Sequence, residues 1–161
     1  MSPGYWRRED ATEEYFRAHL ADGTGPFLRT GDLAFIHDDE LVICGRAKDL
    51  IVIRGRNIYP QDVEQSAELA HPALRLGGGA AFAVEDEGGT ELESLVLVCE
   101  VDGEPDEPEV AAAIKSVVLR EYDLHVHDVL LVPPYSVPKT SSGKKQRSST
   151  KRLWLAARGQ A

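Results

Sequence analysis

The amino-acid sequence predicts an α+β fold, with helices packed on a small three-stranded sheet and an additional two-stranded hairpin. The chain has 161 residues, a length that suits one small domain with an appendage. From residue 50 onward, apolar β-branched runs alternate with segments of helical periodicity, which is typical of a mixed sheet-and-helix domain. The first 45 residues read as a helix and a hairpin without an obvious core. We therefore expect them to belong to something larger.

The elements before residue 50 follow from short-range patterns. Tyr15, Phe16 and Leu20 recur at helical spacing, and a turn-rich stretch follows them. Two short apolar runs then flank a polar turn, which is the pattern of a hairpin. The expected elements are a helix over 8–20 and strands over 33–36 and 41–44.

The elements after residue 49 carry stronger signals. Pro60 and Pro108 suit the first turn of a helix, and each is followed by apolar residues at helical spacing. Runs rich in valine, leucine and isoleucine lie between the helical segments. In chain order, the expected elements are a strand at 50–53, a helix at 60–70, strands at 80–84 and 95–101, a helix at 107–122, a strand at 126–132 and a helix near 149–158.

Charge is distributed unevenly along the chain. The formal net charge is −9, from 27 acidic and 18 basic side chains. Yet residues 137–161 contain seven basic residues and no acidic one, and 46–56 holds four basic residues against Asp49 alone. An acidic chain with two confined cationic segments favours local handling of an anion and argues against a nucleic-acid partner.

The sequence also argues against a membrane-spanning protein, a secreted protein and a protein held by disulfides or a cysteine-bound metal. The longest apolar runs, such as 95–99, are far too short to span a membrane, and no secretory signal pattern opens the chain. Cys44 and Cys99 form neither a disulfide framework nor a metal motif, and we interpret both as small core residues. A cytoplasmic location is expected.

The sharpest local motif is Pro138-Lys139-Thr140-Ser141-Ser142-Gly143-Lys144. Its glycine permits close approach of the backbone to a ligand, and a lysine ammonium can reach a phosphate or carboxylate oxygen. A phosphate-binding P-loop is excluded, because Pro138 and Lys145 stand where that motif needs glycine and a hydroxyl residue. The alternative is a solvated basic tail.

Two further segments carry possible chemistry. Asp32, just after a glycine at a strand start, could accept hydrogen bonds from a ribose diol, although Gly-Asp is also an ordinary turn. The segment 45–60 has charged residues at its start and glycines at both ends, which suits a hinge followed by a hairpin. Its alternative is a basic hairpin without a function.

Taken together and in this order, the segments resemble the closing motifs of adenylate-forming enzymes, the superfamily of acyl-CoA synthetases, peptide-synthetase adenylation domains and luciferases. The matching segments are 4–6, 29–32, 45–64 and 138–144. The stretch Arg-Gly-Arg-Asn-Ile-Tyr-Pro-Gln-Asp at 54–62 is most similar to fatty acyl-AMP ligases. An acyl-CoA ligase is the alternative within the superfamily, and a non-catalytic module that docks a carrier protein is the alternative outside it.

The resemblance implies a domain organisation and a reaction. Residues 1–46 would end a large N-terminal adenylation domain, and 47–161 would form a mobile C-terminal domain. The whole enzyme would use ATP and Mg²⁺ to convert a fatty acid to an acyl-adenylate. It would pass the acyl group to the phosphopantetheine of an acyl carrier protein of a polyketide or nonribosomal peptide synthase. As an excised part of such an enzyme, this chain alone is expected to be inactive.

The resemblance also implies roles for particular residues. Lys144 matches the catalytic lysine, whereas Lys139 and Lys145 are expected to be solvated or docking residues. Asp32 and Arg46 would bind ATP, Lys48 and Asp49 would form the hinge, and Gly55 would leave a path for pantetheine. No metal ligand is assigned.

Three side chains outside these motifs are interpreted conservatively. His125 and His127 share one face of a strand, and we interpret them as an ordinary surface pair in preference to a zinc site. Trp154 lies in the last helical segment, and we expect it to be a packing anchor.

Overall fold

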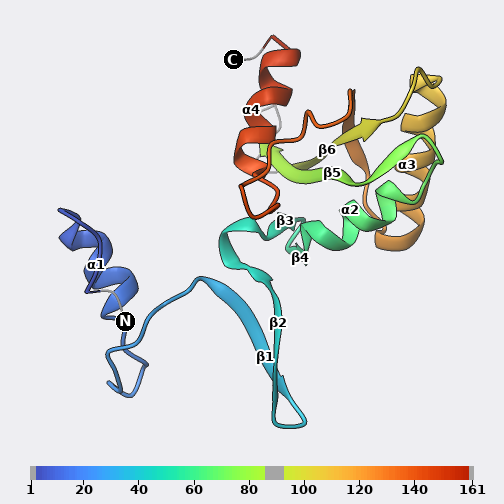
Figure 1. The fold of residues 1–161 in the computed structure, drawn as a ribbon. Helices are drawn as coiled ribbons and strands as arrows, with labels where there is room; N and C mark the ends of the chain where they lie inside the picture. The colour runs from blue at the N-terminus through green and yellow to red at the C-terminus, as the bar shows by residue number, and fades with distance from the viewer. Residues whose placement is uncertain (1–2, 86–92, 160–161) are drawn as a thin grey trace. The chain divides into compact units, whose positions relative to one another are not determined.

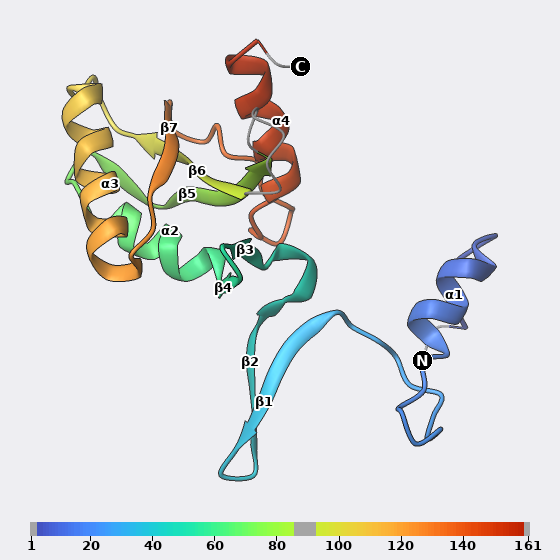
Figure 2. The same cartoon turned by 180° about the vertical axis from the view of Figure 1, so that it is seen from behind.

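The computed structural model describes residues 3–85 and 93–159. The chain divides into two compact units, Met1–Lys48 and Asp49–Ala161. Figures 1 and 2 show the elements of both units from opposite sides. Each unit is considered by itself below.

The first unit contains helix α1 (Glu9–Phe16) and the antiparallel strands β1 (Asp32–His37) and β2 (Glu40–Arg46). The turn between the strands is Asp38-Asp39, with positive φ angles of 50° and 63°. Two consecutive residues with positive φ angles are typical of the tight two-residue hairpin turn, whose twist matches that of the flanking strands. The predicted hairpin is therefore confirmed, and each strand extends slightly beyond its predicted ends.

The prediction of a helix through residue 20 is wrong. Helix α1 ends at Phe16, because Ala18 enters an antiparallel bridge with Phe27. The Ala18 amide donates to the Phe27 carbonyl at 3.1 Å, and the Phe27 amide donates back at 2.7 Å. These bonds hold residue 18 in an extended pairing that a continuing helix could not make.

The second unit is built on the three-stranded sheet that the sequence predicts. Its strands are β5 (Leu74–Glu85), β6 (Glu93–Val101) and β7 (Val126–Val132), in the order β5-β6-β7. Strands β5 and β6 are antiparallel, and β6 and β7 are parallel. Helix α3 (Glu107–Tyr122) supplies the crossover that a parallel pair requires.

Alternation along β6 creates a core on each face of the sheet. Leu95 and Leu97 pack with residues of α3 and of helix α2 (Pro60–Glu68), while Val96 and Val98 pack with Trp154. Trp154 lies on helix α4 (Arg147–Ala157). The helices therefore cover opposite faces, as Figures 1 and 2 show. Burial on both faces explains why β6 is a nearly continuous apolar run.

Local signals account for some element ends in this unit but not for others. Helix α3 has its predicted bounds, because Asp106 caps it by accepting from the Glu109 amide at 3.1 Å and Asp123 ends it with a left-handed φ of 54°. Helix α2 ends at Glu68, two residues earlier than predicted. Strand β5 begins six residues earlier than predicted, with an irregular register between Leu74 and Gly79.

A second hairpin precedes α2. Strands β3 (Ile51–Ile53) and β4 (Arg56–Ile58) are antiparallel, and the turn between them is Arg54-Gly55. Their isoleucines belong to the same core as α2 and α3. The hairpin is therefore fastened to the second unit by its apolar residues.

The structure also shows which of the expected core residues, Cys44, Cys99 and Trp154, are buried. Cys99 is buried, and its burial raises the pKa of its thiol to about 12. Cys44 is only half-buried, because it lies on the two-stranded hairpin of the first unit, so its interpretation as a core residue is wrong. Trp154 is confirmed as a packing anchor, with its ring edge-on to that of Phe82 at 6.2 Å between centroids. No helix among the described residues has the length and apolar character needed to cross a membrane.

Asp128 joins α4 to the sheet, and its ionisation carries a testable consequence. It accepts from the Trp154 indole at 2.6 Å and from two nitrogens of Arg158 at 2.8 and 2.9 Å. Burial raises the pKa of Asp128, but the hydrogen bonds from Arg158 and Trp154 outweigh this effect, and the pKa is lowered overall. A lowered pKa in the folded state means that the carboxylate stabilises the fold at neutral pH and loses this effect as the pH falls through that pKa.

We predict that Asp128→Asn lowers the free energy of unfolding at pH 7 by about 1.5–3 kcal/mol, the usual contribution of hydrogen bonds to a charged group. Denaturant unfolding of the chain measures the change. The difference from wild type should shrink in acid. Asp123→Asn is the matched control, because asparagine also adopts the left-handed conformation. A deficit that persists undiminished at low pH would contradict the assignment.

Candidate active site

The lysine motif forms a closed loop between β7 and α4. The Thr140 amide donates to the Lys144 carbonyl at 2.8 Å, and the Gln146 amide donates to the Pro138 carbonyl at 2.8 Å. Gly143 has a φ of +80°, a conformation that favours glycine. Lys144 itself is exposed. The loop thus presents this ammonium to solvent from a hydrogen-bonded backbone.

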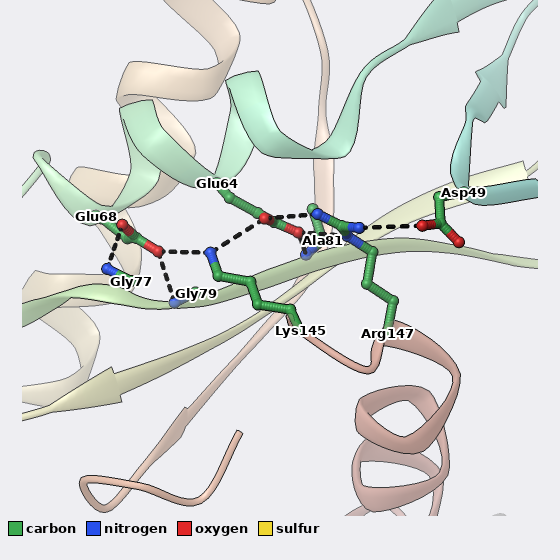
Figure 3. A network of polar contacts seen from close by, with 8 residues as sticks. All are labelled: Asp49, Glu64, Glu68, Gly77, Gly79, Ala81, Lys145 and Arg147. Carbon is green, nitrogen blue, oxygen red and sulfur yellow. Dashed lines mark hydrogen bonds and ion pairs between the residues drawn. The ribbon is translucent and has the colours of Figure 1, made fainter. Parts of the chain in front are cut away.

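Lys145, the next residue, points toward the carboxylates of α2 (Figure 3). Its ammonium lies 3.1 Å from Glu64 Oε2 and 2.9 Å from Glu68 Oε1, and only 18% of its side chain is exposed. The expectation that Lys145 is solvated is therefore wrong. The cause is the pair of carboxylates on one face of α2, one helical turn apart, which neutralise a lysine brought into the interior. Lys139, in contrast, is exposed, as expected.

Glu64 is the most deeply buried charge of this cluster, with 2% of its side chain exposed. Its carboxylate accepts hydrogen bonds from Arg147 Nε at 2.7 Å, from Arg147 Nη2 at 2.9 Å and from the Ala81 amide at 3.0 Å. Burial alone raises the pKa of Glu64, but Arg147, Lys145 and the Ala81 amide outweigh it and lower the pKa overall. The carboxyl is therefore held ionised. Arg147 also contacts Asp49 Oδ2 at 3.4 Å, so the predicted hinge residue Asp49 joins the same network.

Glu68 lies in a backbone cradle formed by the irregular part of β5. The amides of Gly77 and Gly79 donate to its two oxygens at 2.7 and 2.8 Å. A Cβ atom at Gly79 would lie 3.0 Å from Glu68 Oε1, and one at Gly78 would lie 2.8 Å from Glu100 Cβ. The three consecutive glycines therefore let β5 approach two buried carboxylates. Sequence reasoning missed this role, although the run of glycines was its visible signal.

The other end of the loop is fastened by Glu100 of β6. This carboxylate has 2% of its side chain exposed and accepts from the Val137 amide at 2.9 Å, immediately before the loop. Arg75 Nε lies 3.5 Å from its other oxygen. Buried carboxylates therefore hold the chain on both sides of Lys144.

In the first unit, the structure brings Asp32 and Arg46 together. They face each other across β1 and β2, and Arg46 Nε lies 3.2 Å from Asp32 Oδ1. Both line a cavity of about 850 Å³, together with Tyr5, Thr30 and Lys48. Both predicted ATP-binding residues and one predicted hinge residue, Lys48, thus line one cavity of this unit.

Gly55 lies at the tip of the β3-β4 hairpin. Arg54 and Gly55 have φ angles of 51° and 73°, so the tight turn itself favours glycine at the second position. A Cβ atom at Gly55 would meet no atom of the chain within 4 Å. The flanking Arg54 and Arg56 line a second cavity of about 350 Å³, with His125 and His127 on its wall.

The lysine loop lies on the α+β second unit and the Asp–Arg pair lies in the first, as the resemblance to the closing part of an adenylate-forming enzyme implies. Residues 48–161 match the family model described as Disco-interacting protein 2-like, AMP domain, and the chain belongs to this family. Its resemblance to fatty acyl-AMP ligases is confirmed.

Relatives of known name agree with this assignment. The chain is 50% identical over 160 residues to the medium-chain-fatty-acid–acyl-carrier-protein ligase JamA of Moorena producens, covering 96% of this chain and 26% of JamA. It is 38% identical over 162 residues to the putative fatty-acid–CoA ligase fadD21 of Mycobacterium leprae, covering 92% of this chain and 27% of that protein. The chain thus spans about a quarter of the length of the curated relatives it matches.

The fold agrees as well. A structure from a study of fatty acyl-adenylate ligases of E. coli and L. pneumophila superposes with a TM-score of 0.76 at 32% identity, covering 98% of this chain and 26% of that one. The predicted α+β fold class is therefore confirmed. These relatives are named as ligases of fatty acids or as fatty acyl-adenylate ligases.

The buried network predicts a large and specific stability effect. We expect Glu64→Gln to lower the free energy of unfolding by about 3–5 kcal/mol at neutral pH, because it removes one partner of a buried ion pair. Since the pKa of Glu64 is lowered in the folded protein, the wild-type advantage should decline as the pH falls through that pKa.

Chemical denaturation of the two proteins at several pH values tests this. Glu121→Gln, an exposed position on α3, serves as the control for loss of one negative charge. A Glu64→Gln variant as stable as the control would show that the network does not hold the fold together.

Proposed function

We propose that this chain is the closing part of a fatty acyl-AMP ligase that loads an acyl carrier protein. The fatty carboxylate attacks the α-phosphorus of ATP, the bond to the bridging oxygen breaks, and pyrophosphate leaves. A phosphopantetheine thiol then attacks the acyl carbonyl and displaces AMP. The observation that carries the proposal is the exposed Lys144 on a loop fastened at both ends, in a chain half identical to JamA.

The first step supplies the reason for a lysine. Negative charge builds around the α-phosphate while two anions approach each other, and a positioned ammonium stabilises that charge most strongly in the transition state. Lys144 is the residue proposed for this role. Asp32 would hold the ribose hydroxyls and Arg46 would reach the nucleotide, which agrees with their shared cavity. Among the described residues, no three or more His, Cys, Asp or Glu side chains form a group that could hold a metal ion.

We also propose that 1–46 ends a larger N-terminal domain and that 47–161 is the mobile C-terminal domain. The first unit leaves an unusual amount of apolar surface on a two-stranded hairpin, which suits a face covered by more protein. The exposed residues are Phe35, Ile36, Leu41, Val42 and Ile43. Lys48 and Asp49 lie on either side of the boundary between the two compact units, as hinge residues should.

The surface around Gly55 is the basis for proposing an acyl carrier protein as the acceptor of the acyl group. Arg54, Arg56, His125 and His127 gather at one cavity beside this turn, although Glu93 and Asp123 lie there too. The two arginines offer cationic contacts to an acidic carrier protein, beside the two carboxylates of the same cavity. Coenzyme A is the alternative acceptor, in keeping with the name of fadD21. A docking module without chemistry is the second alternative.

We predict that Lys144→Ala in the full-length protein lowers the rate of acyl-adenylate formation by about 10²–10³-fold, the usual effect of losing one charge-stabilising group. Pyrophosphate release with ATP and a fatty acid measures this rate. Lys115→Ala, an exposed lysine on α3, is the matched control. The chain by itself is expected to release no pyrophosphate. Undiminished adenylation by the Lys144 variant would exclude the proposed catalytic role.

A second prediction concerns the acceptor. Arg56→Glu should raise the KM for acyl carrier protein by about tenfold, because charge reversal at an interface rim weakens an electrostatically guided encounter. Thioester formation at several carrier concentrations measures it, with Arg152→Glu on the exposed face of α4 as control. Acyl-CoA as the main product of the wild-type enzyme would favour the acyl-CoA ligase. Stoichiometric carrier binding without adenylation would favour the docking module.

A further inference from the structure

The network in Figure 3 is built around two cations that follow Lys144 in the sequence, Lys145 and Arg147. Lys145 and Arg147 point into the second unit, and each has only 18% of its side chain exposed. Lys144 lies immediately before them and is exposed. The backbone that carries Lys144 thus continues directly into two side chains that are held in the interior.

The carboxylates that receive these cations are themselves immobilised. Glu64 is bound by the Ala81 amide, and Glu68 is bound by the amides of Gly77 and Gly79. All three donors belong to β5, which pairs with β6 along the sheet and packs against α2. Lys145 therefore binds to two fixed points at 3.1 and 2.9 Å, and its ammonium has little freedom.

Such a network is an inefficient way to gain stability. Well-packed apolar residues of similar volume often stabilise an interior as well as a buried ion pair does, because desolvation of the charges is costly. The ion pairs instead fix the orientation of each cationic side chain, because each cation must lie beside particular carboxylate oxygens. A loop that delivers an ammonium to a reacting phosphate needs this property, because small misplacements of a catalytic group reduce rates strongly.

We propose that Lys145 is a positioning residue for adenylate formation, and that its ion pairs with Glu64 and Glu68 hold the loop in the conformation from which Lys144 acts. This inference rests on the proposed function of Lys144. It makes Lys145 necessary for the first half-reaction alone, because Lys144 takes no part in the attack of the thiol on the finished adenylate.

The test uses the full-length enzyme with Lys145→Met. Pyrophosphate release gives kcat and KM for adenylation, and thioester formation from supplied acyl-adenylate gives the rate of the second half-reaction. We expect kcat for adenylation to fall by about tenfold to a hundredfold, with the KM for ATP little changed. Transfer from supplied acyl-adenylate should keep its wild-type rate. Lys145→Arg, which keeps the cation, should recover most of the loss.

Two further variants keep the test decisive. Lys145→Met combined with Glu68→Gln removes the unpaired buried charge, and it replaces the single variant if that one fails to fold. Lys151→Met, a half-buried lysine that donates to the Ala83 carbonyl at 3.0 Å, is the matched control for losing such a side chain. In a Lys144→Ala background, Lys145→Met should cause no further loss of adenylation, because a positioning residue acts only through the group it positions.

The outcomes separate this inference from the function on which it rests. Equal losses in both half-reactions, or full adenylation by a folded Lys145 variant while Lys144→Ala is impaired, would overturn the positioning role and leave the proposed function intact. Undiminished adenylation by Lys144→Ala would overturn both.

Discussion

The interior charge of Glu64 is the constraint on which the second unit depends. A carboxylate with almost no solvent contact must be neutralised and hydrogen-bonded, or it is strongly destabilising. Its partners come from three places: the Ala81 amide on β5, Arg147 at the start of α4 and Lys145 in the loop before it. Satisfying one side chain of α2 therefore fixes where the sheet, the last helix and the lysine loop meet.

The same principle recurs at the other end of the loop. Glu100 is buried in β6 and accepts from the Val137 amide, so the chain enters and leaves the loop at carboxylates that have little room to move. The three glycines of β5 make this possible by letting the strand pass close to Glu68 and Glu100. Part of the acidic excess of the chain is thus internal: the basic segment after residue 137 supplies the counter-charges of Glu64 and Glu68, and Arg75 lies beside Glu100. The charge pattern of the sequence reflects packing as well as ligand chemistry.

Patterns that depend on near neighbours were readable from the sequence, and those that depend on distant partners were not. Helix α3 and strand β7 have their predicted bounds, because Pro108 and the apolar spacing act locally. The end of α1 was missed because it is set by a bridge between Ala18 and Phe27. Lys144 and Lys145 are adjacent and chemically identical in the sequence. Only the carboxylates of α2, some eighty positions earlier in the chain, determine which of them is turned inward.

The division of the chain into two units places the ion-pair network next to the proposed hinge, because Asp49 belongs to both the network and the hinge. The Asp–Arg pair proposed to hold the nucleotide lies in the first unit, and the Lys144 loop lies in the second. Asp49 belongs to the second unit and is tied to Arg147, whereas Lys48 belongs to the first. In the proposed mechanism, a rotation of the second unit would carry Asp49 along with the lysine loop for as long as its ion pair with Arg147 persists, and Lys48 and Asp49 would absorb the dihedral changes.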